Sequence, residues 1–250
     1  TGVKANFCKL NWDIHKKDPS KTPMFRDLVG NSSCESHISM DLSELITKLH
    51  QYDKTKSRKA VLTTTTAHTI PPTGFVFHES RCGSTLVANS LAAFSPSTIR
   101  VYSESGPPLA ALGSCGESFS KCDRSRAAAL FKDVVYLMGR SNNLEESHLF
   151  FKIQSIGSRF IGVMREAFPD TPWIFVHREP VQVMMSHFAV GNVKNVNCLR
   201  HRNNPPKVVK DLLNNRGLNV REVTNEVYCA AHLATLCQSA LEESISSQGL

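Results

Sequence analysis

Four short apolar runs, rich in β-branched and aromatic residues, recur through the middle of the chain and constrain its fold more than any other feature. The runs are GFVFH, TIRVYS, HLFFKI and PWIFVH, at residues 74–78, 98–103, 148–153 and 172–177. Amphipathic helix patterns follow them, at residues 85–94, 124–139, 157–168 and 180–190. Such an alternation is typical of a mostly parallel sheet with both faces covered. We therefore predict an α/β fold of three layers, with helices flanking a central sheet.

The segments on either side of this alternation are less regular. Residues 1–58 hold turn signals and one helix pattern, at residues 41–50, so we expect an N-terminal extension packed on a main domain of residues 59–250. Further elements are expected as an edge strand at residues 59–64 and helices at residues 207–214 and 220–244.

The charge of the chain favours an anionic partner. Its 250 residues carry a formal net charge of +7, and the isoelectric point is about 9.0. The basic residues are scattered and not interleaved with aromatic residues, so a nucleic-acid groove is disfavoured and a small phosphorylated ligand is favoured. No apolar run approaches the roughly 20 residues that a membrane span needs, so no transmembrane segment is predicted in this chain.

Eight cysteines suit an oxidising compartment, and we expect the secretory pathway or the Golgi lumen, with the cytoplasm as the alternative. The glycosylation sequon Asn31-Ser32-Ser33 points the same way. Cys229 and Cys237 would lie about 12 Å apart on one helix, too far to bridge each other. Two Cys-x-x-His pairs, which begin at Cys198 and Cys229, resemble zinc ligand pairs, but core packing is the favoured interpretation of the second.

The loop after the first strand, ESRCGST at residues 79–85, has the form of an anion cradle. A strand, a glycine turn and a helix N-terminus present free N–H groups and a partial positive charge. The loop lacks the two glycines and the lysine of a Walker A sequence, and no Asp follows the other strands. A metal-dependent nucleotide hydrolase or kinase is therefore disfavoured. A cysteine phosphatase would need Arg at position 88, which is Ala; a turn that only connects strand to helix remains an alternative.

A second candidate phosphate site follows the fourth strand, in the stretch WIFVHREPVQVMMSHF at residues 173–188. Arg178 precedes a helix and Ser186 lies two turns into it, about 12 Å further on. We expect the long Arg178 side chain to fold back toward Ser186, because a guanidinium with a hydroxyl makes a good phosphate clamp.

Together, these two motifs resemble those of the sulfotransferase superfamily, whose members use 3′-phosphoadenosine 5′-phosphosulfate (PAPS). The loop Arg81-Cys82-Gly83-Ser84-Thr85 matches the family's 5′-phosphosulfate loop, and Arg178 with Ser186 matches its 3′-phosphate motif. The resemblance covers residues 74–190 and, more loosely, 228–242. It implies a P-loop-like fold and a PAPS-dependent sulfotransferase with PAPS as co-substrate, a hydroxyl-bearing acceptor and no metal.

The chain departs from the family pattern in two ways. Many cytosolic members carry Lys-x-His at a central strand end, whereas this chain has Lys152-Ile153-Gln154, and Gln cannot accept a proton. We therefore expect Glu104 to be the catalytic base, as in the branch that includes tyrosylprotein and bacterial sulfotransferases. Partial burial should raise its pKa, although nearby Arg81 and Lys152 would oppose this rise. Arg81 and Lys152 would receive the charge that develops on the leaving phosphate. Family members also usually continue further, so we expect part of the site to lie beyond Leu250.

The acceptor remains open among a sugar, a peptide tyrosine and a small metabolite, and the oligomeric state is also open. Two loops, at residues 105–122 and 189–206, are the candidates for the acceptor pocket. The alternative functions are a catalytically inactive nucleotide-binding P-loop module and, less favoured, a P-loop kinase.

Overall fold

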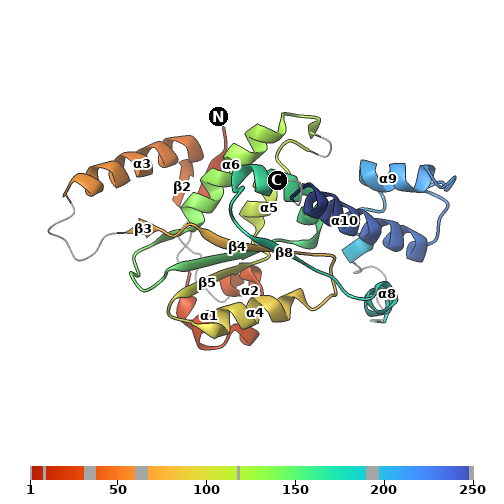
Figure 1. Cartoon of the computed structure of the whole chain (residues 1–250), viewed down its shortest axis with the longest axis horizontal. Helices are drawn as coiled ribbons and strands as arrows, with labels where there is room; N and C mark the ends of the chain where they lie inside the picture. Colours follow the sequence, from red (N-terminus) through yellow and green to blue (C-terminus); the bar gives the residue numbers. More distant parts are fainter. Residues whose placement is uncertain are drawn as a thin grey trace.

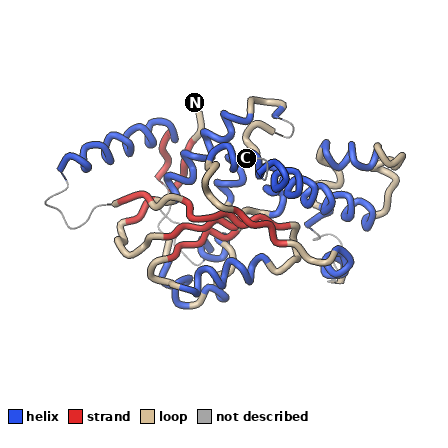
Figure 2. The backbone as a smooth tube through the Cα atoms, viewed as in Figure 1, coloured by secondary structure: helices blue, strands red, loops and turns tan. Residues whose placement is uncertain are grey.

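The structure is a computed structural model that describes residues 2–7, 10–30, 38–59, 67–116, 119–189 and 197–247. A four-stranded sheet forms its centre (Figures 1 and 2). Each strand pairs in parallel with its neighbour, which confirms the predicted parallel sheet. Across the sheet the strands follow the order β5 (Ile99–Ser103), β7 (His148–Lys152), β4 (Pro72–His78) and β8 (Trp173–Val176).

Helices cover both faces of this sheet, so the predicted three-layer α/β arrangement is present (Figure 1). One face carries α4 (Ser84–Phe94), whose Ala88 and Ala92 pack on the sheet. The other face carries α5 (Gly106–Leu112), α6 (Arg124–Met138), α7 (Ile161–Ala167) and α10 (Asn225–Ser247).

The two-residue period of the strands distributes the core between these faces. In β4, Phe75 and Phe77 are fully buried in the large cluster on the α6 side. In β5, Val101 belongs to the α4 side, whereas the next residue, Tyr102, joins the α6 side. Alternate side chains of a strand point to opposite faces, so strands buried on both faces have the continuous apolar sequences noted above.

The remaining elements surround this core. Trp12 and Phe25, from the N-terminal helices, contact the ring of Tyr102 with centroids 5.1 Å and 5.6 Å away. The remaining helices are α1 (Trp12–Lys17), α2 (Phe25–Gly30), α3 (Leu42–Lys59), α8 (Pro180–Phe188) and α9 (Lys207–Asn214). Two antiparallel pairs join β1 (Lys4–Phe7) to β2 (Ile38–Asp41) and β3 (His68–Thr69) to β6 (Arg140–Ser141). Short 3₁₀ helices are η1 (Pro19–Lys21), η3 (Ser155–Phe160) and η5 (Asn197–Leu199).

Several predicted boundaries were wrong. The helix predicted at 41–50 continues to Lys59 as α3, and the first third of the helix predicted at 157–168 is 3₁₀. Helix α10 begins at Asn225 rather than at residue 220, because the Thr224 hydroxyl accepts a hydrogen bond from the Val227 N–H at 3.3 Å and caps the helix. The predicted edge strand at residues 59–64 falls, after Lys59, outside the described residues.

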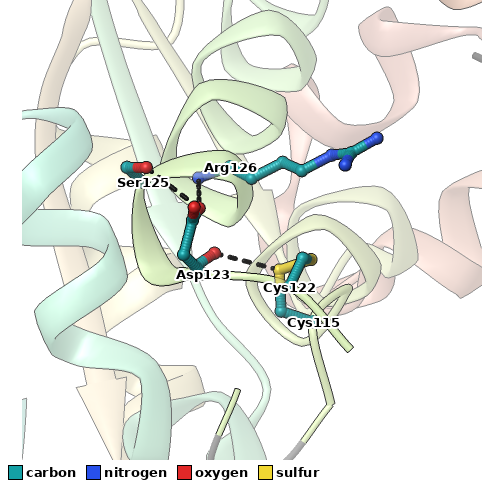
Figure 3. Close-up of a disulfide and its surroundings, with 5 residues drawn as sticks. All are labelled: Cys115, Cys122, Asp123, Ser125 and Arg126. Carbon is teal, nitrogen blue, oxygen red and sulfur yellow. Dashed lines mark hydrogen bonds between the residues drawn. A yellow bond between two sulfur atoms is a disulfide. The ribbon is translucent and has the colours of Figure 1, made fainter. Parts of the chain in front are cut away.

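Two disulfides join parts of the chain that the structure describes. Cys115 and Cys122 close a short loop before α6, where Asp123 caps the helix by accepting from the Arg126 N–H at 2.9 Å (Figure 3). Cys198 and Cys229 tie η5 to α10. Cys82 and Cys237 are free, whereas Cys8, Cys34 and the sequon at residues 31–33 lie outside the described residues.

Among the helices described, none combines the length and the apolar character that a membrane span requires.

Candidate functional site

Three strand ends bring a buried cluster of charged and polar side chains together. Lys152 is the last residue of β7, Glu104 follows β5 and His78 ends β4, and these three strands are neighbours. The Lys152 ammonium forms an ion pair with Glu104 Oε1, and His78 Nε2 lies 3.4 Å from the same oxygen. Parallel strands end at one edge of a sheet, so this edge is where a ligand would meet them.

The surroundings of Glu104 hold it in the ionised form. Burial would raise its pKa, but the neighbouring His78 imidazole and the ion pair with Lys152 outweigh burial and lower the pKa to about 2. The expectation of a raised Glu104 pKa was therefore wrong. Lys152 is almost completely buried, and burial lowers its pKa against the opposing attraction of Glu104. The pair leaves no net charge here, which reduces the cost of burying each partner.

Gln154 has a supporting role in this arrangement. Its side-chain amide donates to the backbone carbonyl of Glu104 at 3.1 Å. The Glu104 N–H donates to the Lys152 carbonyl at 2.7 Å, which extends the β5–β7 ladder by one residue. Gln154 thus fixes the backbone that carries the carboxylate, and it stands where Lys-x-His sequences place their histidine.

The loop from β4 to α4 has the backbone conformation of a tight turn. Ser80, Arg81 and Gly83 all have positive φ, at 86°, 55° and 92°. Gly83 is the N-cap of α4, and as a glycine it supplies no side-chain hydrogen bond to the first N–H groups of this helix. Glu104 also has a positive φ, of 55°. Left-handed non-glycine residues are uncommon and gather at ligand sites, so their coincidence here supports a functional edge.

The second motif lies beside this loop, but its contacts differ from those expected. Arg81 Nε donates to Ser186 Oγ at 3.0 Å, so the two motifs meet. Within the described residues, Arg178 does not reach Ser186: its Nε donates to Gln182 Oε1 at 2.7 Å. The reason is geometric, because Gln182 lies one helical turn beyond Arg178, whereas Ser186 lies two turns away.

Two residues of this site, His78 and Glu79, were not predicted from the sequence. Besides His78, Glu79 is buried to 2% exposure, and its carboxylate accepts from the Arg178 backbone N–H and, at 3.3 Å, from the Cys237 thiol. That contact and burial raise the pKa of Cys237 to about 12, burial being the larger effect. Their position at the end of the first predicted strand is the sequence signal that could have identified them.

An open cavity of about 660 Å³ adjoins this edge, between β8 and α10. Trp173, Phe175 and Leu241 supply apolar walls, and Glu79 and Arg178 supply charged groups. A mixed lining of this kind suits a ligand with a ring and a charged substituent.

The remaining candidate residues are positioned as follows. Cys82 is free and half-buried, and Ser84 and Thr85 begin α4. Cys198 and Cys229 are bonded to each other, so neither thiol is available to zinc. In the part of the chain that the structure describes, no cluster of His, Cys, Asp and Glu is arranged to bind a metal.

Comparisons with known proteins identify no relative of this chain. No family model, no curated protein and no solved structure matches the chain.

Proposed function

We propose that this chain is an enzyme that transfers a sulfuryl group from PAPS to a hydroxyl acceptor. The observation that carries the proposal is the ion pair of Glu104 with Lys152. It lies near the loop that precedes α4, in which Arg81 and Gly83 have positive φ. A base and a cation side by side are what this reaction needs, since a proton must leave the acceptor while negative charge develops on the leaving group.

The donor would bind across the two motifs. The N–H groups at the start of α4, together with Arg81, suit the 5′-phosphosulfate. Ser186 and Arg178 suit the 3′-phosphate, and the contact of Arg81 with Ser186 supports two anion sites side by side. Arg178 would exchange its exposed hydrogen bond with Gln182 for the phosphate, which costs little because a charged acceptor replaces a neutral amide oxygen.

The chemical step would proceed by direct transfer. Glu104 takes the proton of the acceptor hydroxyl, the hydroxyl oxygen bonds to sulfur, and the bond from sulfur to the bridging oxygen breaks. The electron pair of that bond stays on the 5′-phosphate, where Lys152 and Arg81 stabilise it. The products are a sulfate ester and the 3′,5′-bisphosphate.

Donor binding would also activate the base. Lys152 pairs with Glu104 in the free chain, and a bound phosphosulfate would attract the ammonium away. Burial would then raise the pKa of Glu104, which makes the carboxylate a stronger base only when the donor is in place.

Sulfur-labelled PAPS and an extract that supplies candidate acceptors test this proposal. We expect labelled sulfate esters with the wild-type chain and a large loss with Arg81→Met, which keeps the length of the side chain and removes its charge. Absence of labelled product across sugar, peptide and small-molecule fractions would contradict a transferase and favour an inactive nucleotide-binding module.

The disulfides support a proposed location. Two bridges between described cysteines suit an oxidising lumen such as that of the secretory pathway or Golgi. Retention of both bridges in protein isolated from its host with thiols blocked would support this location, and fully reduced cysteines would contradict it.

A further inference from the structure

His78 is a buried histidine that the reaction described above does not use. His78 is the last residue of β4 and is 4% exposed. The backbone on both sides of the ring is fixed, because the Ser158 hydroxyl accepts from the His78 N–H at 3.3 Å and donates to its carbonyl at 3.1 Å. These two bonds fix the backbone that carries the imidazole beside the carboxylate.

The two ring nitrogens face different partners. Nδ1 receives a hydrogen bond from the Ser80 N–H at 3.1 Å, and since an N–H can only donate, Nδ1 must be the unprotonated nitrogen. The proton of the neutral ring then sits on Nε2, which lies 3.4 Å from Glu104 Oε1 and has no hydrogen-bond partner of ordinary length among the described residues. Burial, the largest effect, lowers the pKa of His78, so the ring stays neutral near pH 7. The loop that begins α4 thus sets the tautomer of a residue in the neighbouring cluster.

We propose that His78 is the positioning residue that holds the Glu104 carboxylate through Nε2–H when Lys152 turns to the donor. The effect of this contact on catalysis rests on the sulfotransferase function proposed above. Lys152 has two tasks, and it cannot pair fully with Glu104 while it stabilises the leaving phosphate. In the free chain the His78 contact is longer than an ordinary hydrogen bond, and it shortens once the ammonium moves away.

His78 is not the catalytic base. Nε2 already carries a proton, so His78 cannot take one from Glu104. Besides Glu104, Cys82 and Arg26 act on the pKa of Lys152, which Cys82 raises and Arg26 lowers. Lys152 in turn lowers the pKa of His78. His78 also lowers the pKa of Glu104, but as a neutral donor it orients the carboxylate without adding a second positive charge beside Lys152.

Nuclear magnetic resonance of the full chain, with ¹⁵N-labelled histidine, tests the contact without any need for activity. The chain has ten histidines, and His78→Gln assigns the signal. We expect Nδ1 to be unprotonated and Nε2 protonated at pH 7, and we expect the Nε2 signal to move in Glu104→Gln. It should move again when the 3′,5′-bisphosphate saturates the wild-type chain. An Nδ1–H tautomer, or an Nε2 signal that does not move in Glu104→Gln, would overturn the proposal.

Kinetics then separate positioning from mere packing. His78→Leu should lower kcat roughly tenfold to a hundredfold, the effect of losing one hydrogen bond to a charged group, while KM for the donor stays constant. His78→Gln, which keeps an N–H donor at similar reach, should recover part of the loss. His15→Leu is a matched control, since His15 is also buried and bonds to Thr22. A folded His78→Leu with wild-type kcat would overturn the proposal, whereas a wild-type chain without transfer would refute the proposed function and leave the resonance result to decide on His78.

Discussion

At the scale of single residues, opposing effects act on the ionisation of the Glu104 carboxylate. Burial favours neutral Glu104, whereas Lys152 and His78 favour the charged form and prevail. A carboxylate with a pKa of about 2 is always ionised near neutrality but is a weak base. The proposed removal of Lys152 by the donor resolves this conflict, because it ties the strength of the base to the presence of substrate.

Glu104→Gln tests the role of the carboxylate. Gln keeps the size and the hydrogen bonding but cannot take a proton, so turnover should fall by roughly 10² to 10⁴. Affinity for the bisphosphate should not fall, because the proposed role of Glu104 is on the acceptor side and its replacement leaves Lys152 available to the donor. Arg178→Ala should do the reverse and weaken donor binding while it spares more of the chemical step. Single-turnover kinetics at saturating donor measure both, and near-normal turnover in Glu104→Gln would place the base elsewhere.

The same pair predicts how stability depends on pH. The pKa of Glu104 is lowered from 4.5 to about 2, so its ionisation stabilises the folded chain fully above about pH 5 and this contribution is lost as pH falls toward 2. The difference in unfolding free energy between wild type and Glu104→Gln should therefore shrink across that window, by on the order of 3 kcal/mol at most. Denaturant unfolding at a series of pH values measures it. A difference that stays constant from pH 6 to pH 3 would show that Glu104 is not paired.

At the scale of elements, the strands were the most predictable part of the chain. Each of the four apolar runs forms a strand of the central sheet, because residues buried on both faces leave a continuous signal. Helix α5 was missed because Gly106-Pro107-Pro108 resembles a loop, although proline fits the first turn of a helix. The boundary of α10 depended on one hydroxyl at Thr224, which no periodicity reveals.

The candidate site was predictable in its residues but not in its contacts. Glu104, Lys152 and the loop could be placed at one edge because parallel strands end together. The partners of each side chain depend on strand order, and the sequence does not give the arrangement that sets β7 between β5 and β4. For this reason the pairing of Glu104 with Lys152 and His78, and that of Arg81 with Ser186, emerged only from the structure.

Gly83→Ala tests the cradle as an element. Gly83 has a φ of +92° and open space where a Cβ would point, so Ala brings backbone strain and no clash. We expect a loss of about 1 kcal/mol in stability and a clear loss of bisphosphate affinity. Gly217→Ala is the matched control, with a φ of +69° and equally open space outside the site. It should cost similar stability and leave affinity unchanged, and equal affinity losses in both variants would argue against a cradle at Gly83.

At the scale of the whole molecule, the fold joins distant parts of the chain at one edge of the sheet. The loop at Arg81 follows β4, whereas Ser186 lies on α8, and their contact links segments 105 residues apart. The N-terminal part reaches the same edge, where Met24 Sδ accepts from the Ser103 hydroxyl at 3.5 Å. A ligand bound here would contact several elements at once, so its binding should stabilise the entire fold.

Thermal unfolding with nucleotides tests the central claim most directly, because it needs no knowledge of the acceptor. The 3′,5′-bisphosphate product carries both phosphates that the two motifs would bind, whereas AMP lacks the 3′-phosphate. At about 100 times its dissociation constant, the bisphosphate should stabilise the chain by about 2.7 kcal/mol, and AMP at the same concentration should do much less. Ser186→Ala should reduce that advantage. Equal shifts with the two nucleotides, or a larger shift with ATP and Mg²⁺, would contradict the account.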